Sequence, residues 1–353
     1  MSKKKHWRYA DAGIDVNRIK KEQGALADLL GLTFANREGK IGAVLEKIGH
    51  YSGLIDAGGD TALALHTDGV GTKVLIAQMM DRFDTVGVDC VAMNVNDIIC
   101  VGAEPIAFLD YIAVKKFDEK LINSIAKGLV AGANEASVAI VGGETAVMPD
   151  VIEGEGDKAF DLAGMVLGVA SKSRIITGDK IKEGDVVIGV ESSGIHSNGL
   201  SLARKVLLEK HRITEKIPGV DRSVGEDLLE PTRIYVKPVL ELLKSNVKVS
   251  GLAHITGGAF SKMTRLIRER DIGFQLNNMP RTPPLFKFIQ REGDISEHEM
   301  YRTFNMGIGF CVVSPSSEVN AVEKIFRKHK MKTHVIGEAS KGAGVYIGDI
   351  QVS

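Results

Sequence analysis

The chain has 353 residues, of which 44% are hydrophobic and 25% are charged, and 45 basic residues balance 45 acidic ones. Without an excess of positive charge, the chain is not expected to bind nucleic acid by bulk electrostatics. No apolar run approaches the roughly 18 residues that a membrane span requires, so we expect a soluble, cytoplasmic protein with no membrane partner. Cys90, Cys100 and Cys311 stand among apolar residues without CxxC spacing, which predicts buried thiols.

The first half of the chain alternates strand-like and helix-like stretches, which predicts an α/β fold. A polar connector, residues 171–185, then interrupts the pattern, and a chain of this length usually forms two domains. We therefore predict domains at 1–170 and 171–353. The expected strands of the first half are 61–68, 105–114, 138–143 and 161–170, and its expected helices are 85–102 and 118–136.

The second half continues with the same two kinds of stretch. We find no internal repeat of 20 to 50 residues, so a solenoid or propeller is not expected. The expected strands are 186–194, 249–254, 306–315, 334–339 and 344–349, and the clearest helices are 198–210, 235–245 and 316–330.

The stretch "HTDGVGTK", residues 66–73, directly follows an apolar strand. Glycine lets a backbone bend sharply or approach a ligand, and lysine supplies a mobile charge suited to phosphate. A phosphate-binding loop is one interpretation, and a hairpin with ordinary turn residues is about as good an account of this loop alone.

Asn94 and Asp97 lie three residues apart in the helix expected at 85–102. An amide and a carboxylate on one helix face suit Mg²⁺, which takes oxygen ligands and often only one or two carboxylates from the protein. A solvated polar face is the alternative, and this helix considered alone favours it.

Three further glycine-bearing stretches follow strands: "VGGETAVMP" (141–149), "ESSGIHSNGLSL" (191–202) and "AHITGGAF" (253–260). The first places Glu144 and Thr145 at a strand's carboxyl end, where α/β sheets gather ligands. The second suggests a helix capped by Ser197 or Asn198 whose amides suit a phosphate, although a plain capped helix explains it equally well. In the third, His254 ends a strand, as many merely packed histidines do.

Together these stretches resemble the phosphoribosylformylglycinamidine cyclo-ligase family, the aminoimidazole ribonucleotide synthetases of purine biosynthesis. Each motif is weak alone, but the ordered set is specific and covers nearly the whole chain. The matching stretches are "YADAGID", "TDGVGTK", "NDI", "GAEPIAFLDY", "GGETAVMP", "DLAGMVLGV", "SSGIHSNGLSL", "PTRIYVKPV", "HITGGAF" and "FNMGIGF".

The resemblance implies two α/β domains of the aminoimidazole ribonucleotide synthetase type, with the N-terminal sheet domain forming a homodimer and ATP bound near that interface. It implies ATP- and Mg²⁺-dependent ring closure of formylglycinamidine ribonucleotide to 5-aminoimidazole ribonucleotide, with release of ADP and phosphate. A transient contact with the preceding enzyme of the pathway is a further expectation.

The resemblance also implies roles for individual residues. Asp68 and Asp97 match the expected Mg²⁺ ligands, while Lys73, His254 and His196 are the expected catalytic residues, with Lys73 against phosphate. The residues expected to bind the nucleotide or its phosphates are Asp11, Asp15, Lys21, Gly69, Gly71, Thr72, Asp110, Gly142, Gly143, Glu144, Thr145, Ser193 and Asn198.

Two other functions stay open at this point. One is another ATP-dependent activity of the same superfamily, such as a glutamine-dependent synthetase subunit or a small-molecule kinase. The other is a non-enzymatic scaffold like those of hydrogenase maturation, which is expected to lose the phosphate loops that this chain retains. Turnover of ATP only in the presence of formylglycinamidine ribonucleotide separates both from the cyclo-ligase.

Overall fold

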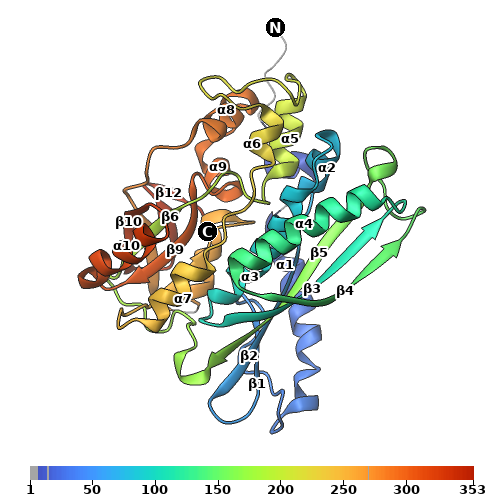
Figure 1. The fold of residues 1–353 in the computed structure, drawn as a ribbon. Helices are drawn as coiled ribbons and strands as arrows, with labels where there is room; N and C mark the ends of the chain where they lie inside the picture. The colour runs from blue at the N-terminus through green and yellow to red at the C-terminus, as the bar shows by residue number, and fades with distance from the viewer. Residues whose placement is uncertain (1–6, 14–15, 269) are drawn as a thin grey trace.

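The computed structural model describes residues 7–13, 16–268 and 270–353. Their strands form two sheets, one from each half of the chain (Figure 1). The first sheet contains β1 (Gly53–Asp56), β2 (Thr61–Gly69), β3 (Glu104–Val114), β4 (Ala139–Val147) and β5 (Phe160–Ser171). The second contains β6 (Val186–Glu191), β7 (Gly251–His254), β8 (Ile272–Leu276), β9 (Ile308–Ser314), β10 (Thr333–Lys341), β11 (Gly344–Ile347) and β12 (Ile350–Gln351).

The first sheet has the order β1-β2-β5-β3-β4 and is antiparallel except for the β3–β4 pair. Residues of β5 alternate between buried and more exposed, as expected when one sheet face packs on a core. That face lies against α3 (Asp84–Ile99), and α4 (Glu119–Ala136) packs on α3 (Figure 1). The α4 helix also makes the crossover that the parallel pair β3–β4 requires.

The second sheet has the order β12-β11-β8-β10-β6-β9-β7, with β11 and β8 as its parallel pair. All residues of β7 and β9 are buried, so these strands lie inside the C-terminal half. The remaining helices are α1 (Val16–Gly31), α2 (Lys73–Met79), α5 (Leu200–Leu208), α6 (Val224–Leu228), α7 (Val236–Lys244), α8 (Pro284–Gly293), α9 (Glu297–Thr303) and α10 (Val319–Lys328). Short 3₁₀ segments include η1 (Tyr9–Ala12), η4 (Lys172–Arg174) and η5 (Ala259–Leu266).

Most predicted elements agree with the structure. The predicted helices at 85–102 and 118–136 are α3 and α4, and the three cysteines are buried with free thiols. Within the described ranges, no helix has the length and apolar character needed to cross a membrane. The division into domains at residues 170 and 171 stays a proposal; the last strand of the first sheet ends at Ser171.

Three local predictions were wrong. Asn94 and Asp97 do not form a solvated face, because both are buried between α3 and its neighbours. Gly142 to Thr145 do not form a turn after a strand, because they lie inside the exposed edge strand β4. The cap of α5 is Gly199, with φ +75°, in place of Ser197 or Asn198.

The crossing of α3 and α4 depends on two facing glycines. A Cβ on Gly128 would lie 1.8 Å from the carbonyl oxygen of Asp84, and a Cβ on Gly87 would lie 2.4 Å from that of Ile125. Since neither neighbour is a flexible side chain, the helices approach this closely only because both residues are glycine.

We expect Gly128→Ala to lower the free energy of unfolding by about 2 to 3 kcal/mol, because the added methyl group forces the two helices apart. Thermal unfolding measures the effect. Gly24→Ala in α1 is the matched control, because a Cβ there meets nothing within 4 Å and alanine favours a helix. Equal melting temperatures for the Gly128→Ala variant and the wild type would contradict this account of the crossing.

Candidate active site between the two halves

A cavity of about 520 Å³ lies between the first sheet and η5. Strands β1 and β2 form one wall, Asp97 of α3 lies in it, and Lys262 and Arg265 of η5 contribute from the C-terminal half. A volume of this size is typical of small-molecule sites. Its lining residues are Gln23, Phe34, Val44, Glu46, Ile48 to Ile55, Leu65 to Asp68, Asp97, Lys262 and Arg265.

Asp97 is the centre of a charged cluster that joins both halves of the chain. Its Oδ1 lies 2.7 Å from Nδ1 of His254, and its Oδ2 lies 3.6 Å from Nε2 of His66 and 3.8 Å from Nζ of Lys262. Lys262 also donates to Oγ1 of Thr256 at 2.6 Å. This carboxylate therefore fixes three potentially cationic side chains at the edge of the cavity.

The protonation states in this cluster follow from its contacts. Burial alone would raise the pKa of Asp97, but Lys262, His254 and His66 hold it well below its usual range. Burial lowers the pKa of His254 in spite of its bond to Asp97. A neutral His254 thus donates its Nδ1 proton to Asp97, and its Nε2 accepts from Asn96 at 3.4 Å.

Asp68 differs from Asp97 in its surroundings. Burial raises its pKa and the charge of Asp97 raises it further, while Lys262 and His66 oppose both effects. Its Oδ1 accepts from the backbone amide of Gly69 at 2.8 Å. Asp68 can therefore still offer a carboxylate oxygen to a cation at the cavity. The oxygens of Asp97, by contrast, already face two histidines and a lysine.

The two carboxylates at the cavity differ in how well they suit Mg²⁺. One carboxylate, Asp68, fits the role, since Mg²⁺ commonly takes only one or two protein ligands and fills the rest with water and phosphate oxygens. Asp97 does not fit, because a cation beside it would be close to Lys262 and His66. In the described ranges no group of three or more His, Cys, Asp or Glu side chains is arranged for a metal ion.

Lys73 does not have the position expected of a phosphate contact. It is fully buried, its Nζ lies 2.8 Å from Oδ2 of Asp89, and it donates to the carbonyl oxygen of Glu230 at 2.6 Å. Asp89 also accepts from the amide and hydroxyl of Thr232, at 2.7 and 2.6 Å. Lys73 therefore connects the two halves of the chain and does not line the cavity, and its contact with phosphate stays a prediction.

The two histidines expected to be catalytic are buried behind the cavity. His254 contacts Asp97 and Asn96 and does not line the cavity. His196 is fully buried with φ +61°, and neither ring nitrogen has a hydrogen-bond partner in the described part of the chain. Burial and the neighbouring His254 lower the pKa of His196 well below its usual value, so it is neutral.

The other residues of the loop before α5 also face the protein interior. Ser193 donates its hydroxyl to the carbonyl oxygen of Pro231, and Ser197 lies 3.2 Å from the Thr232 hydroxyl. The Nδ2 of Asn198 is buried without a partner among the described residues, and its Oδ1 faces Gly257. None of these side chains lines the cavity. Phosphate binding by the backbone amides of this loop stays a prediction.

The turn between β2 and α2 keeps the backbone expected of it. Gly69 ends β2, and Gly71 has φ +68°, which a residue with a side chain rarely adopts. Thr72 caps α2 and places its hydroxyl 2.9 Å from that of Ser201. Gly71 and Thr72 are exposed, so their amides remain accessible to a ligand.

The remaining expected residues are spread over the molecule. One cross-strand row of the first sheet contains two of them. It runs over β2, β5, β3 and β4 through Asp68, Gly164, Asp110 and Gly143, so Asp110 lies in the same row as Asp68. Burial raises the pKa of Asp110, and its carboxylate lies over Gly143. Gly142, Glu144 and Thr145 are exposed on β4.

Of the three N-terminal residues expected to bind the nucleotide, the two that the structure describes also do not lie together. Asp11 accepts from the amide of Arg8 at 2.9 Å and caps η1, which packs near α5 in the C-terminal half. Lys21 is exposed on α1, two residues before Gln23 of the cavity. Asp15 lies outside the described residues.

Three cavity residues were missed by reasoning from the sequence: His66, Lys262 and Arg265. His66 is the first residue of the stretch at 66–73, but a single histidine at the end of an apolar strand carries no signal for a cavity. Lys262 and Arg265 lie three residues apart just after the Gly-Gly turn at 257–258, a spacing that places two cations on one side of η5. Arg265 stacks on the ring of buried Tyr51, with 5.0 Å to its centroid.

His50, also in the cavity wall, makes stability depend on pH. Burial and the nearby Arg268 lower its pKa to about 4 against a small opposing effect from its bond to the carbonyl oxygen of Thr177. Between about pH 4 and 6.5 the unfolded chain binds a proton that the folded chain does not, so stability falls as the pH falls.

We expect His50 alone to lower the free energy of unfolding by about 2 kcal/mol at pH 5 relative to pH 7.5. Urea denaturation of the wild type and of His50→Gln at both pH values measures this. In the variant, the difference in the free energy of unfolding between the two pH values should be smaller by about 2 kcal/mol, whatever its stability at pH 7.5. An unchanged difference between the two pH values would contradict the lowered pKa.

Family models match the two halves of the chain separately. Residues 49–170 match the AIR synthase related protein, N-terminal domain, and residues 182–350 match the C-terminal domain of the same description. The phosphoribosylformylglycinamidine cyclo-ligase of Methanocaldococcus jannaschii is 49% identical over 333 residues, which cover 93% of this chain and 91% of the relative. This chain belongs to the phosphoribosylformylglycinamidine cyclo-ligase family.

A second relative is similar in sequence to this member of the cyclo-ligase family, and solved structures are similar to it in fold. The protein of the same name from Thermococcus kodakarensis is 50% identical over 321 residues, covering 91% of this chain and 92% of the relative. Thiamine-monophosphate kinase from Stenotrophomonas maltophilia K279a has a TM-score of 0.65 at 16% identity and covers 93% of this chain and 96% of its own. AaThiL complexed with AMPPCP and TMP has a TM-score of 0.62 at 16% identity, with 92% and 93% covered.

These comparisons confirm the family that the motifs indicated and the prediction of two α/β halves. The sequence identity to each of these solved structures is only 16%, so they support the fold alone. The family is one of ligases, so the chain is an enzyme of that class.

Proposed function

We propose that this cyclo-ligase closes the imidazole ring of 5-aminoimidazole ribonucleotide in the cavity between β2 and η5. The substrates are ATP and formylglycinamidine ribonucleotide, and the other products are ADP and phosphate. The observation that carries the placement is the 2.7 Å bond between Asp97 of one half and His254 of the other, beside a cavity that holds Lys262 and Arg265.

The reaction needs activation of a poor leaving group. The terminal phosphoryl group of ATP moves to the formyl amide oxygen, ADP leaves and the amide nitrogen loses its proton. The amidine nitrogen of the same molecule then attacks that carbon, the carbon–oxygen bond breaks, phosphate departs and the new ring nitrogen loses a proton. Because the attack is intramolecular, the protein mainly has to fold the substrate and neutralise phosphoryl charge.

The cavity offers side chains for these two tasks. Lys262 and Arg265 bring positive charge to phosphate oxygens, and Asp97 fixes the position of Lys262. Asp68 would hold Mg²⁺, which when bound supplies further positive charge to the phosphates. The exposed amides at Gly71 and Thr72 supply hydrogen-bond donors nearby. The structure of AaThiL with AMPPCP, an analogue of ATP, supports a nucleotide as ligand of this fold.

The reaction is tested by measuring ADP and 5-aminoimidazole ribonucleotide together. We expect ADP to form only when formylglycinamidine ribonucleotide is present, with one ring product for each ADP. ADP formation without that substrate, or phosphorylation of a small molecule such as thiamine monophosphate, would favour the kinase alternative. Absence of any ATP turnover would favour the scaffold.

The first sheet supports the proposal of a homodimer. The edge strand β4 exposes the apolar side chains of Val141 at 64% and Val147 at 54%, and its neighbour β3 exposes Ile106 and Tyr111. An exposed edge strand with such side chains is usually covered by a partner. Symmetric pairing through one surface is the commonest arrangement of identical chains.

Light scattering should therefore give twice the chain mass of 38.0 kDa. Val141→Asp places a charge on the exposed edge and should shift the protein toward the single-chain mass. Because Val141 is exposed in the single chain, the variant should still unfold cooperatively. A fully active wild-type monomer at assay concentration would contradict the dimer.

A further inference from the structure

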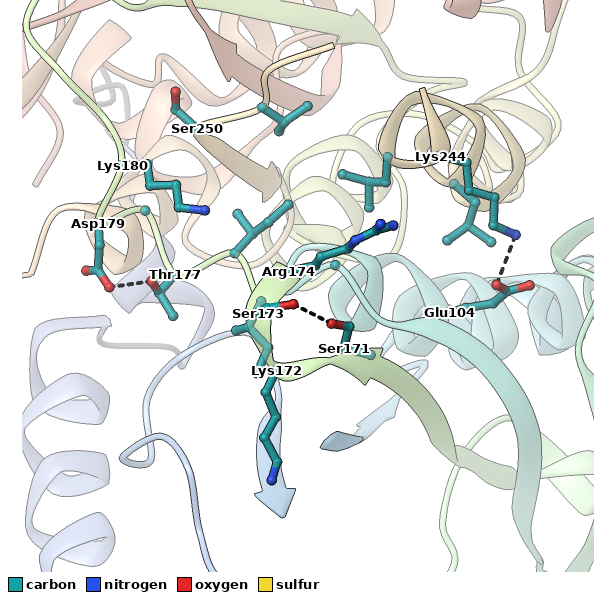
Figure 2. Close-up of a pocket in the computed structure, with 18 of the residues that line it drawn as sticks. Glu104, Ser171, Lys172, Ser173, Arg174, Thr177, Asp179, Lys180, Lys244 and Ser250 are labelled. Carbon is teal, nitrogen blue, oxygen red and sulfur yellow. Dashed lines mark hydrogen bonds and ion pairs between the residues drawn. The ribbon is translucent and has the colours of Figure 1, made fainter. Parts of the chain in front are cut away.

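A second cavity, of about 530 Å³, lies where the connector between the two sheets meets the C-terminal half (Figure 2). The connector residues 171–180 form one side, and the end of α7 with the chain leading into β7 forms the other. It shares no lining residue with the cavity of the proposed active site. Its size falls in the range of small-molecule sites.

Two cations in the connector have no counter-charge among the described residues. Arg174 and Lys180 form no ion pair or side-chain hydrogen bond with any other described residue, and Figure 2 shows both side chains extending toward the space below α7 and β7. By contrast, Lys172 pairs with Asp56 at 2.6 Å and points away from that space, and Lys244 pairs with Glu104 at 3.0 Å.

The lining as a whole is positive. Without Lys172, which pairs with Asp56 and points away, Arg174, Lys180 and Lys244 carry three positive charges, and Glu104 and Asp179 carry two negative charges, which leaves an excess of one. Asp179 accepts from the hydroxyl of Thr177 at 2.7 Å and is exposed. An excess of positive charge in a concave site concentrates anions there.

The opposite wall is apolar. Leu240 and Leu243 of α7 line the cavity together with Val247 and Val249, which follow that helix, and Ile176 of the connector also lines it. Hydroxyl groups of Ser173, Thr177 and Ser250 are also part of the lining. The lining thus combines two cations that are unpaired among the described residues, hydroxyl groups and aliphatic side chains that suit an apolar or planar group.

We propose that this cavity binds a small phosphorylated molecule with a planar or apolar body, of the chemical class of a nucleoside monophosphate. Arg174 and Lys180 bind the phosphate, the hydroxyl groups face the sugar, and the aliphatic wall of α7 covers the base. The proposal does not rest on the proposed reaction, because the two cavities have separate linings.

The site is also adjacent to the cavity of the proposed active site. Thr177 lines the second cavity, and its carbonyl oxygen accepts from Nε2 of His50, which lines the first, at 3.3 Å. A ligand held between the connector and α7 contacts segments of both halves of the chain. Its binding therefore stabilises their observed arrangement and raises the melting temperature.

The test uses the full-length protein with its active site saturated by AMPPCP and Mg²⁺. Calorimetric titration with AMP, ribose 5-phosphate and inorganic phosphate then measures binding outside that site. We expect AMP to bind with one site per chain, at least tenfold more tightly than inorganic phosphate and more tightly than ribose 5-phosphate. The double variant Arg174→Ala/Lys180→Ala should weaken AMP binding at least tenfold and leave ring closure at its wild-type rate.

Lys127→Ala/Lys324→Ala is the matched control, because it removes two exposed positive charges from α4 and α10. It should bind AMP like the wild type. Equal binding by the Arg174→Ala/Lys180→Ala variant, or binding of AMP only without AMPPCP, would overturn the site. Binding of phosphate as tightly as AMP would overturn the role of the apolar wall. Absent ring closure in the wild type would count against the proposed function and leave this result unaffected.

Discussion

Replacing Asp97 by asparagine is expected to lower the rate of ring closure at least about a hundredfold and to leave the fold intact. The amide keeps the size of the side chain and an oxygen that accepts from Nδ1 of His254. It removes the negative charge that faces Lys262 and His66 at 3.8 and 3.6 Å. Lys262 then loses the group that fixes it at the cavity. The measurement is kcat at saturating substrates, with the melting temperature as the control for folding.

A Mg²⁺ titration separates this explanation from a direct metal contact. Asp68→Asn should require at least about tenfold more Mg²⁺ for half-maximal rate, since a neutral oxygen replaces a carboxylate ligand. Asp97→Asn should lower the maximal rate with little change in that requirement. A strong Mg²⁺ dependence of the Asp97→Asn variant would show that Asp97 is a ligand, and near-normal turnover would remove it from the site.

Much of the fold could be predicted from the sequence because its core elements have strong periodicity. Val88, Val91, Val95 and Ile98 recur at helical spacing; this stripe lies against Gly132 of α4 through Val88 and Val91 and near Gly168 of β5 through Ile98. β8 and α8 were not predicted. The strand β8 is only five residues long, and its place in the sheet depends on pairing with β10 and β11, about 60 to 70 residues later.

The candidate site was predicted less completely than the fold. Asp68 and Asp97 were predicted as Mg²⁺ ligands because they match positions of the family's motifs, and both line the cavity. Lys262 and Arg265 line the same cavity as Asp68 only because the fold brings η5 and β2, which are almost 200 residues apart, to opposite sides of it. A single sequence without such contacts gives no reason to prefer these two cations over the other 43 basic residues.

The position of Lys73 has a local physical cause. A motif states which residues are present but not the direction in which each side chain points. The turn at Gly71 starts α2 at Lys73, and the first turn of that helix packs Val74 and Ile76 into the core. Lys73 lies on the buried side with them, where Asp89 and the carbonyl oxygen of Glu230 are its partners.

Lys73→Met is therefore expected to destabilise the protein by about 3 to 5 kcal/mol, because it leaves the carboxylate of Asp89 buried without its cation. The hydrogen bonds from Thr232 to Asp89 do not replace that charge. Urea denaturation measures the change in the free energy of unfolding. Any loss of ring closure should follow the fraction of unfolded protein and disappear at temperatures where the variant is folded.

A double variant tests the ion pair itself. Lys73→Met/Asp89→Leu removes both charges, so it should be more stable than Lys73→Met alone even though the Thr232 bonds are lost. Lys127→Met, an exposed lysine of α4, should change stability by less than about 0.5 kcal/mol. If instead Lys73→Met unfolds like the wild type but no longer transfers the phosphoryl group, the lysine leaves Asp89 during the reaction. In that case the expectation from the motif, a lysine against phosphate, would replace the interpretation given by the structure.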